Sequence, residues 1–342
     1  MTRPIDTAPA RRGEFEEAIP AAGRPKPVPR ARRAASSARA AAGLLGALAI
    51  AVMGSRSASA AGFLHAVGVE NEYADVIAQI GGRYVRVTAI ETDPNTNPHS
   101  FEASPAIARA IAAASLVVRN GVGYDSWAER ILSAAPSRQR KVIDVQRLLG
   151  LPDNTPNPHL WYDPETMPTV ANAVAAALSA LDRPHAAYFQ ENARRFEASL
   201  APWTAGIASF KARYGGTRVA VTEPVANYLL EAAGCDIATP FNLQTAIMNG
   251  TDPSPQDVAT EEALLAGHDV KVLVYNRQVT DTLTESFLDL ARRSGLPVVG
   301  VYETLPVPGY HYQSWMRAEI EALRKAVADG VSTDELVAGK SR

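Results

Sequence analysis

From residue 61 onward, short apolar runs alternate with amphipathic stretches along the chain. In the first half, runs typical of strands occur at residues 63–69, 84–90, 116–118 and 141–145. Helical patterns lie between them, at residues 72–80, from Ser104 onward, and at residues 124–134. Ser104 followed by Pro105 is a standard helix start. This alternation predicts a parallel sheet covered by helices.

The same alternation returns in the last third of the chain. Strand-like runs are at 218–222, 270–275 and 298–301, and helical patterns are at 224–233, 254–266, 281–294 and 315–328. The two halves look like structural counterparts of each other. We therefore predict an α/β protein of two βα lobes, each with a parallel sheet, and a binding site in the cleft between them.

The middle of the chain has a different pattern. Residues 163–181 form an Ala-rich helical stretch, and residues 185–214 form a second one that contains Pro202. At 1.5 Å per residue the second stretch reaches about 40 Å, and Pro202 should kink it or split it in two. We predict a first lobe over 61–182, a rigid connecting helix over 183–214 and a second lobe over 215–342.

Residues 1–60 have the pattern of a targeting segment. They carry ten Lys and Arg against four Asp and Glu, and an apolar run of about 14 residues, 41–54, precedes Ala58-Ser59-Ala60. This order predicts a signal peptide with a disordered leader, and a periplasmic or secreted protein. No cysteine lies close after the apolar run, so we expect no lipid anchor there.

The composition of the chain argues against some classes of function and of metal site. Beyond residue 60 the chain has 24 basic and 32 acidic residues, which argues against nucleic acid as a partner. Cys235 is the one cysteine in the sequence, which excludes an internal disulfide and a cysteine-rich zinc site. We expect a monomer.

Two of the six histidines share one local context, Asn-Pro-His, at residues 97–99 and 157–159. Each follows a predicted strand and lies in a polar, Pro-rich loop. Proline restricts its own φ and the conformation of the preceding residue, so His99 and His159 should be held on stiff loops. A stiffly held imidazole suits a metal site or a catalytic base.

Two carboxylates occupy comparable places in the second half. Glu223 directly follows the strand at 218–222, and Glu303 follows the strand at 298–301. Ligands of open α/β sheets bind outside the carboxyl ends of strands. Either glutamate alone could be a surface charge or a helix N-terminal charge, and either histidine could be a surface residue. Together, two imidazoles and two carboxylates suit a divalent first-row metal.

These motifs resemble the zinc/manganese-type (cluster A-I) periplasmic substrate-binding proteins of bacterial metal ABC transporters. Residues 97–105 (NPHSFEASP) and 158–164 (PHLWYDP) are similar to the first and second ligand loops of that family. Glu223 and Glu303 lie where the family has its third and fourth ligands. The resemblance covers residues 61–328 and implies the ligand set His99, His159, Glu223 and Glu303, a transported Zn²⁺ or Mn²⁺, and an ABC permease as partner.

Some alternatives stay open. The fourth ligand in that family is commonly Asp, so His311 could replace Glu303. Residues 146–158 contain no histidine, whereas zinc-specific members often carry a His-rich loop there. Glu223 could bind through both oxygens, which suits Mn²⁺, although intrinsic affinity favours Zn²⁺. An exported metallohydrolase and a surface adhesin of the same fold are the alternative functions.

Overall fold

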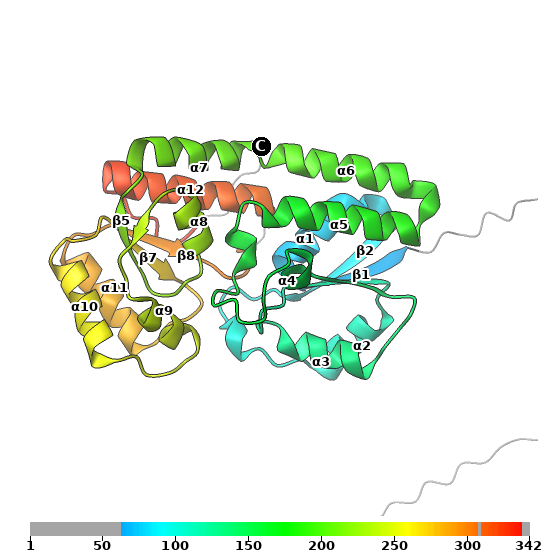
Figure 1. The fold of residues 1–342 in the computed structure, drawn as a ribbon, viewed down its shortest axis with the longest axis horizontal. Coiled ribbons are helices and arrows are strands. Elements are labelled where there is room, and N and C mark those ends of the chain that lie inside the picture. Colours follow the sequence, from blue (N-terminus) through cyan, green and yellow to red (C-terminus); the bar gives the residue numbers. More distant parts are fainter. Residues whose placement is uncertain (1–62, 307–308, 337–342) are drawn as a thin grey trace, which may run out of the picture. The chain divides into compact units, whose positions relative to one another are not determined.

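The computed structural model describes residues 63–306 and 309–336, in which two sheets of four strands are present (Figure 1). The predicted leader and signal peptide over 1–60 lie outside these residues. The strands of the first sheet are β1 (Leu64–Glu70), β2 (Val85–Glu91), β3 (Leu116–Arg119) and β4 (Lys141–Asp144). Those of the second are β5 (Arg218–Val221), β6 (Asp236–Ile237), β7 (Leu273–Asn276) and β8 (Val298–Val301).

The two sheets have the same topology. Their strand orders are β2-β1-β3-β4 and β6-β5-β7-β8, and every pairing between these strands is parallel. In each sheet the first strand in the chain lies next to the second and the third, so the chain reverses direction across the sheet beside that strand. The predicted α/β class with two parallel sheets is confirmed.

Helices connect the strands of both sheets. In the first lobe they are α1 (Asn71–Gly81), α2 (Pro105–Ala113), α3 (Ser126–Ala134), α4 (Val145–Leu148) and α5 (Thr166–Leu181). In the second they are α8 (Asn227–Ala232), α9 (Phe241–Met248), α10 (Pro255–Ala266), α11 (Thr282–Arg293) and α12 (Tyr312–Asp329). The Ser104 hydroxyl accepts the Ile107 N–H, as the predicted start of α2 requires.

The sequence pattern missed α4, β6 and α9 and placed several boundaries a few residues away. Strand β6 has two residues, too few to show a period, and α9 begins shortly after it, at Phe241. The helix expected over 124–134 begins at Ser126 instead. The preceding loop has positive φ at Gly121, Val122 and Gly123, which keeps Tyr124 outside the helix.

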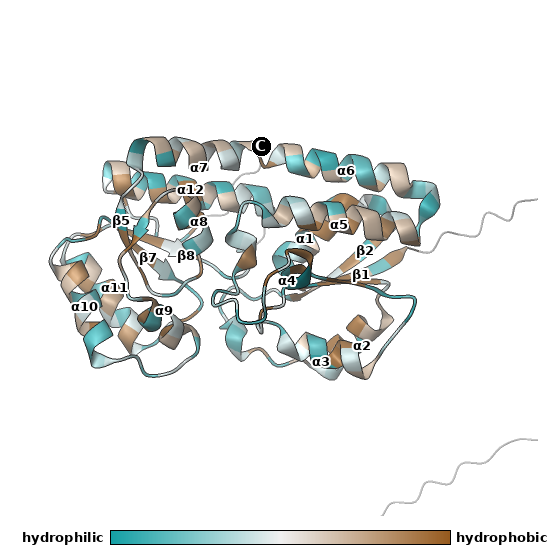
Figure 2. Ribbon diagram, in the orientation of Figure 1, coloured by the Kyte–Doolittle hydropathy of each residue, from teal (hydrophilic) through white to brown (hydrophobic). Residues whose placement is uncertain are grey.

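The middle segment contains α6 (Ala186–Ser199) and α7 (Ala201–Tyr214), separated at Leu200. The split expected at Pro202 is therefore present, because proline has no N–H to bond within a continuous helix. Helix α6 packs against α1 and α5, whereas α7 packs against α12 (Figure 1). Polar and apolar residues are interspersed along both helices, as expected of helices that bury one face (Figure 2).

One hydrophobic core runs from the first sheet through these helices to the second. It includes Tyr73 of α1, Trp203 of α7, Val219 of β5 and Tyr312 of α12. The Tyr312 hydroxyl, at the start of α12, donates to the Trp161 carbonyl at 2.6 Å. The lobes thus share buried contacts along the side that carries α5, α6, α7 and α12.

None of the helices within residues 63–306 and 309–336 combines the length and apolar character needed to cross a membrane.

Trp203 is the residue we choose to test this shared core. It is fully buried, and its ring packs edge-on against Tyr312 with 5.8 Å between centroids. We predict that Trp203→Ala lowers the free energy of unfolding by about 3–5 kcal/mol, since it leaves a large cavity. Urea unfolding measures the change.

The neighbouring Thr204→Ala on the exposed face of α7 is the control, and it should change stability by less than about 0.5 kcal/mol. A loss below about 1 kcal/mol for Trp203→Ala would contradict a core continuous between the lobes.

Candidate metal centre

The two Asn-Pro-His segments fold into the same local turn. The side-chain oxygen of Asn97 accepts the His99 N–H at 2.8 Å, and that of Asn157 accepts the His159 N–H at 3.1 Å. Such an Asx turn mimics a backbone turn. Asparagine and proline therefore both restrain each loop, and the two tripeptides form the same local turn.

Asn157 also orients the ring of His159. Its Oδ1 lies 2.8 Å from His159 Nδ1, and its Nδ2 donates to the Pro224 carbonyl of the second lobe at 2.8 Å. An oxygen acceptor at Nδ1 favours the tautomer with the proton there, in which Nε2 can offer its lone pair to a metal ion. His159 is fully buried, and burial lowers its pKa despite the neighbouring Glu303 carboxylate.

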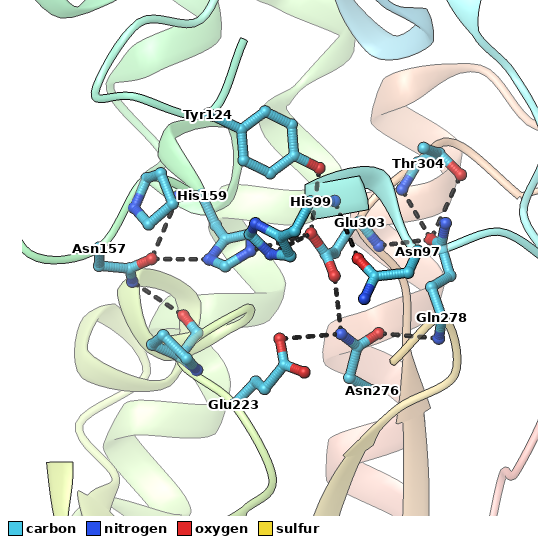
Figure 3. Close-up of polar contacts among 12 residues, drawn as sticks. Asn97, His99, Tyr124, Asn157, His159, Glu223, Asn276, Gln278, Glu303 and Thr304 are labelled. Atoms are coloured by element: carbon cyan, nitrogen blue, oxygen red, sulfur yellow. Dashed lines mark hydrogen bonds and ion pairs between the residues drawn. The ribbon is translucent and has the colours of Figure 1, made fainter. Parts of the chain in front are cut away.

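The second lobe supplies two buried carboxylates. Glu223 follows β5 and Glu303 follows β8, so both lie at the carboxyl ends of parallel strands. One donor atom from each of His99, His159, Glu223 and Glu303 lies within 4.8 Å of every other (Figure 3). The structure brings all four predicted site residues together.

Glu303 has polar contacts from both lobes. Its Oε2 lies 3.1 Å from His99 Nε2 and 3.2 Å from His159 Nε2, and it accepts the Tyr124 hydroxyl at 3.0 Å. Burial favours the neutral acid, but the two imidazoles outweigh it and hold the pKa of Glu303 below its usual range. The carboxylate is therefore ionised at neutral pH.

The pKa of Glu223 is shifted in the opposite direction to that of Glu303. Its Oε2 accepts a hydrogen bond from Asn276 Nδ2 at 3.2 Å, whereas its Oε1 is buried and has no hydrogen-bond partner in the described residues. Burial, and then the charge of Glu303, raise the pKa of Glu223 well above its usual value. An unpartnered buried oxygen is costly unless a cation or proton satisfies it.

His311 does not reach this cluster. Its Nδ1 lies 2.7 Å from Asp75 Oδ1, its side chain is 61% exposed, and it occupies the N-cap position of α12. The structure therefore places Glu303 in the cluster and His311 at the contact between α12 and α1.

Three polar residues of the site were not predicted. Tyr124 contacts Glu303, Asn276 contacts both carboxylates, and Gln278 Oε1 accepts the backbone N–H of Glu303 at 2.7 Å. Asn276 ends β7 and Gln278 lies two residues further on, so the rule about strand ends could have found both. No sequence pattern indicated Tyr124, because the conformation of the loop before α3 determines where this residue lies.

A polar pocket of about 450 Å³ leads to the cluster from outside. His99, Tyr124 and Arg130 line it from the first lobe, and residues 248–250 line it from the second. His99 has the most exposed side chain of the four, 19%, and it lines this pocket. A small ion can therefore approach from the His99 side.

The fold and the buried set of nitrogen and oxygen donors define a solute-binding protein for metal ions. The model of the family described as "Zinc-uptake complex component A periplasmic" matches residues 70–326, and the chain belongs to that family. Its members are solute-binding proteins and not enzymes, which sets aside the metallohydrolase alternative. The adhesin alternative stays an untested prediction.

Individual relatives are distant. The chain is 25% identical to the manganese-binding lipoprotein MntA of Bacillus subtilis over 143 residues, 40% of this chain and 46% of that protein. It thus spans about half the length of this relative. It is 23% identical to a putative metal-binding protein of Chlamydia muridarum over 266 residues, 75% of this chain and 88% of that one.

Among solved structures, the solute-binding protein FpvC of Pseudomonas aeruginosa in complex with Mn²⁺ has a TM-score of 0.65 and 22% identity. The match covers 78% of this chain and 99% of FpvC. This likeness shows the shared fold.

The opposite pKa shifts of the two glutamates generate a prediction. Metal binding needs carboxylates, and burial, together with the charge of Glu303, raises the pKa of Glu223 and so favours its protonated form. We expect Zn²⁺ binding to release a proton from Glu223, and affinity to rise as pH increases.

Calorimetric titration in buffers of different ionisation enthalpy counts the released protons. Glu223→Gln should abolish the release, whereas Glu262→Gln, on the exposed face of α10, should leave it unchanged. A binding enthalpy that does not depend on the buffer would refute this protonation state of Glu223.

Proposed function

We propose that this chain is an extracytoplasmic solute-binding protein that captures a divalent transition metal, Zn²⁺ or Mn²⁺, and delivers it to an ABC permease. We assign the ligands as His99, His159, Glu223 and Glu303. The observation that carries this proposal is the convergence of four donors, two from each lobe, within 4.8 Å.

The spacing of the donors supports metal ligation. Four ligands at 2.0–2.1 Å around a tetrahedral Zn²⁺ lie about 3.3 Å from one another. The nitrogens of His99 and His159 lie 3.1 and 3.2 Å from Glu303 Oε2. Little movement is therefore needed for these three atoms to bind one ion.

Charge supports a dication in the same place. Two carboxylates balance a divalent ion and leave the buried site close to neutral, which reduces the cost of taking the ion out of water. Glu223 Oε1 is buried and has no hydrogen-bond partner in the described residues. A bound ion would satisfy it.

The family and the leader support export. The family description is periplasmic, and residues 1–60 have the basic, apolar and small-residue order of a signal peptide. A binding protein outside the cytoplasm needs a membrane partner to move its cargo inward. We infer that this partner is an ABC permease and that the protein acts as a monomer.

The ligand assignment is tested by titrating purified protein with Zn²⁺ and with Mn²⁺. Wild type should bind about one ion per chain. His99→Ala and Glu223→Ala should each weaken binding by more than about 100-fold, because loss of an outer partner already costs about 10- to 100-fold.

His311→Ala is the matched control, since this histidine is exposed and paired with Asp75. It should bind metal as wild type does. Unchanged affinity in both ligand variants would disprove the site, and weakened binding in His311→Ala would point to a ligand outside the assigned four.

A further inference from the structure

Asn276 lies between the two carboxylates of the proposed site. Its Nδ2 donates to Glu303 Oε1 at 2.8 Å and to Glu223 Oε2 at 3.2 Å (Figure 3). One primary amide has two N–H groups, so it can serve both acceptors at once. The site therefore has one residue that contacts both acidic ligands.

The amide cannot turn over to present its oxygen. Asn276 Oδ1 accepts the Gln278 backbone N–H at 3.0 Å, which identifies the atom facing the carboxylates as nitrogen. The backbone N–H of Asn276 donates to Thr222 Oγ1 at 2.9 Å, and the side chain is buried, with the residue 1% exposed. The donor is fixed in position by β5 and β7.

This arrangement divides the carboxylate oxygens into two kinds. Glu303 Oε1 and Glu223 Oε2 face Asn276, whereas Glu303 Oε2 faces both imidazoles and Glu223 Oε1 has no partner in the described residues. Glu303 Oε2 also accepts a hydrogen bond from the Tyr124 hydroxyl. Each glutamate has one oxygen left for a metal ion.

Gln278 adds a restraint on Glu303. Its Oε1 accepts the backbone N–H groups of Glu303 and Thr304 at 2.7 and 2.9 Å, and its Nε2 donates to the Thr96 carbonyl in the His99 loop at 3.1 Å. Rotation of Glu303 toward a two-oxygen contact would have to break the bond to Asn276 while this backbone stays in place.

We propose that Asn276 is a positioning residue that holds both glutamates to one metal contact each, so that the site is four-coordinate and selects Zn²⁺ over Mn²⁺. The inference rests on the proposed ligand set. Zn²⁺ is satisfied by four N and O ligands, whereas Mn²⁺, a harder ion, gains from additional oxygens. This selection adds to the intrinsically higher affinity of Zn²⁺.

Co²⁺ is the probe of coordination number, because four-coordinate Co²⁺ absorbs visible light strongly and five- or six-coordinate Co²⁺ absorbs weakly. Wild type loaded with Co²⁺ should show the strong bands. Asn276→Leu keeps the number and branching of the side-chain heavy atoms and removes the donor, and Asn276→Ala opens space for water. Both should show weaker bands, since a freed oxygen or a water can then bind the ion.

Competition between Zn²⁺ and Mn²⁺ is the second measurement. The ratio of Zn²⁺ to Mn²⁺ affinity should fall about tenfold or more in both variants, within the range typical of losing an outer partner. Asn192→Leu is the control. Asn192 lies on α6, donates to the Ile80 carbonyl and does not contact the ligands, so this variant should keep the wild-type spectrum and ratio.

The outcomes separate the two proposals. Absence of tight Zn²⁺, Mn²⁺ and Co²⁺ binding in wild type would reject the proposed site itself. Binding with weak Co²⁺ bands in wild type would reject four-coordination while leaving the binding function intact. Wild-type bands and an unchanged affinity ratio in Asn276→Leu and Asn276→Ala would reject the role of Asn276. Both measurements on wild type remain informative if a variant fails to fold.

Discussion

The contact of the buried Glu303 carboxylate with two imidazoles from the opposite lobe is the interaction on which this site depends. Glu303 belongs to the second lobe, and His99 and His159 belong to the first. A buried charge is tolerated where it is paired and hydrogen-bonded, and here Tyr124 and Asn276 also donate to the carboxylate, while Gln278 accepts the backbone N–H of Glu303. The carboxylate therefore ties the lobes together at the place where we expect a cation to bind.

The identical topology of the two sheets makes this meeting point available. Each sheet presents the carboxyl ends of its parallel strands toward the site, Glu223 and Glu303 from the second and the two Asn-Pro-His loops from the first. Behind the site, α6 and α7 continue the core from one sheet to the other. A continuous core on one side and a polar cluster on the other suit a protein that binds an ion between its lobes.

Much of this could be predicted because the signals are local. Periods of two and 3.6 residues marked most strands and helices, and Pro202 marked the break between α6 and α7. The elements that were missed, α4, β6 and α9, are short, and the start of α3 is set by backbone conformations such as the positive φ of Val122. The four candidate ligands were found because they follow strands directly or repeat a motif. Asn276 and Tyr124 were not, since their importance lies in what they contact.

By itself, the sequence determined the class of fold, the two lobes and the residue types of the site, because hydrophobic periods and strand-end positions act over a few residues. Only the tertiary structure decided which oxygen of each glutamate contacts Asn276, that His311 pairs with Asp75 instead of joining the cluster, and that Asn157 orients His159. These facts join residues distant along the chain, such as Asn276 with Glu223, or depend on the orientation of a side chain. The distance and direction of such contacts follow from packing, which no local pattern encodes.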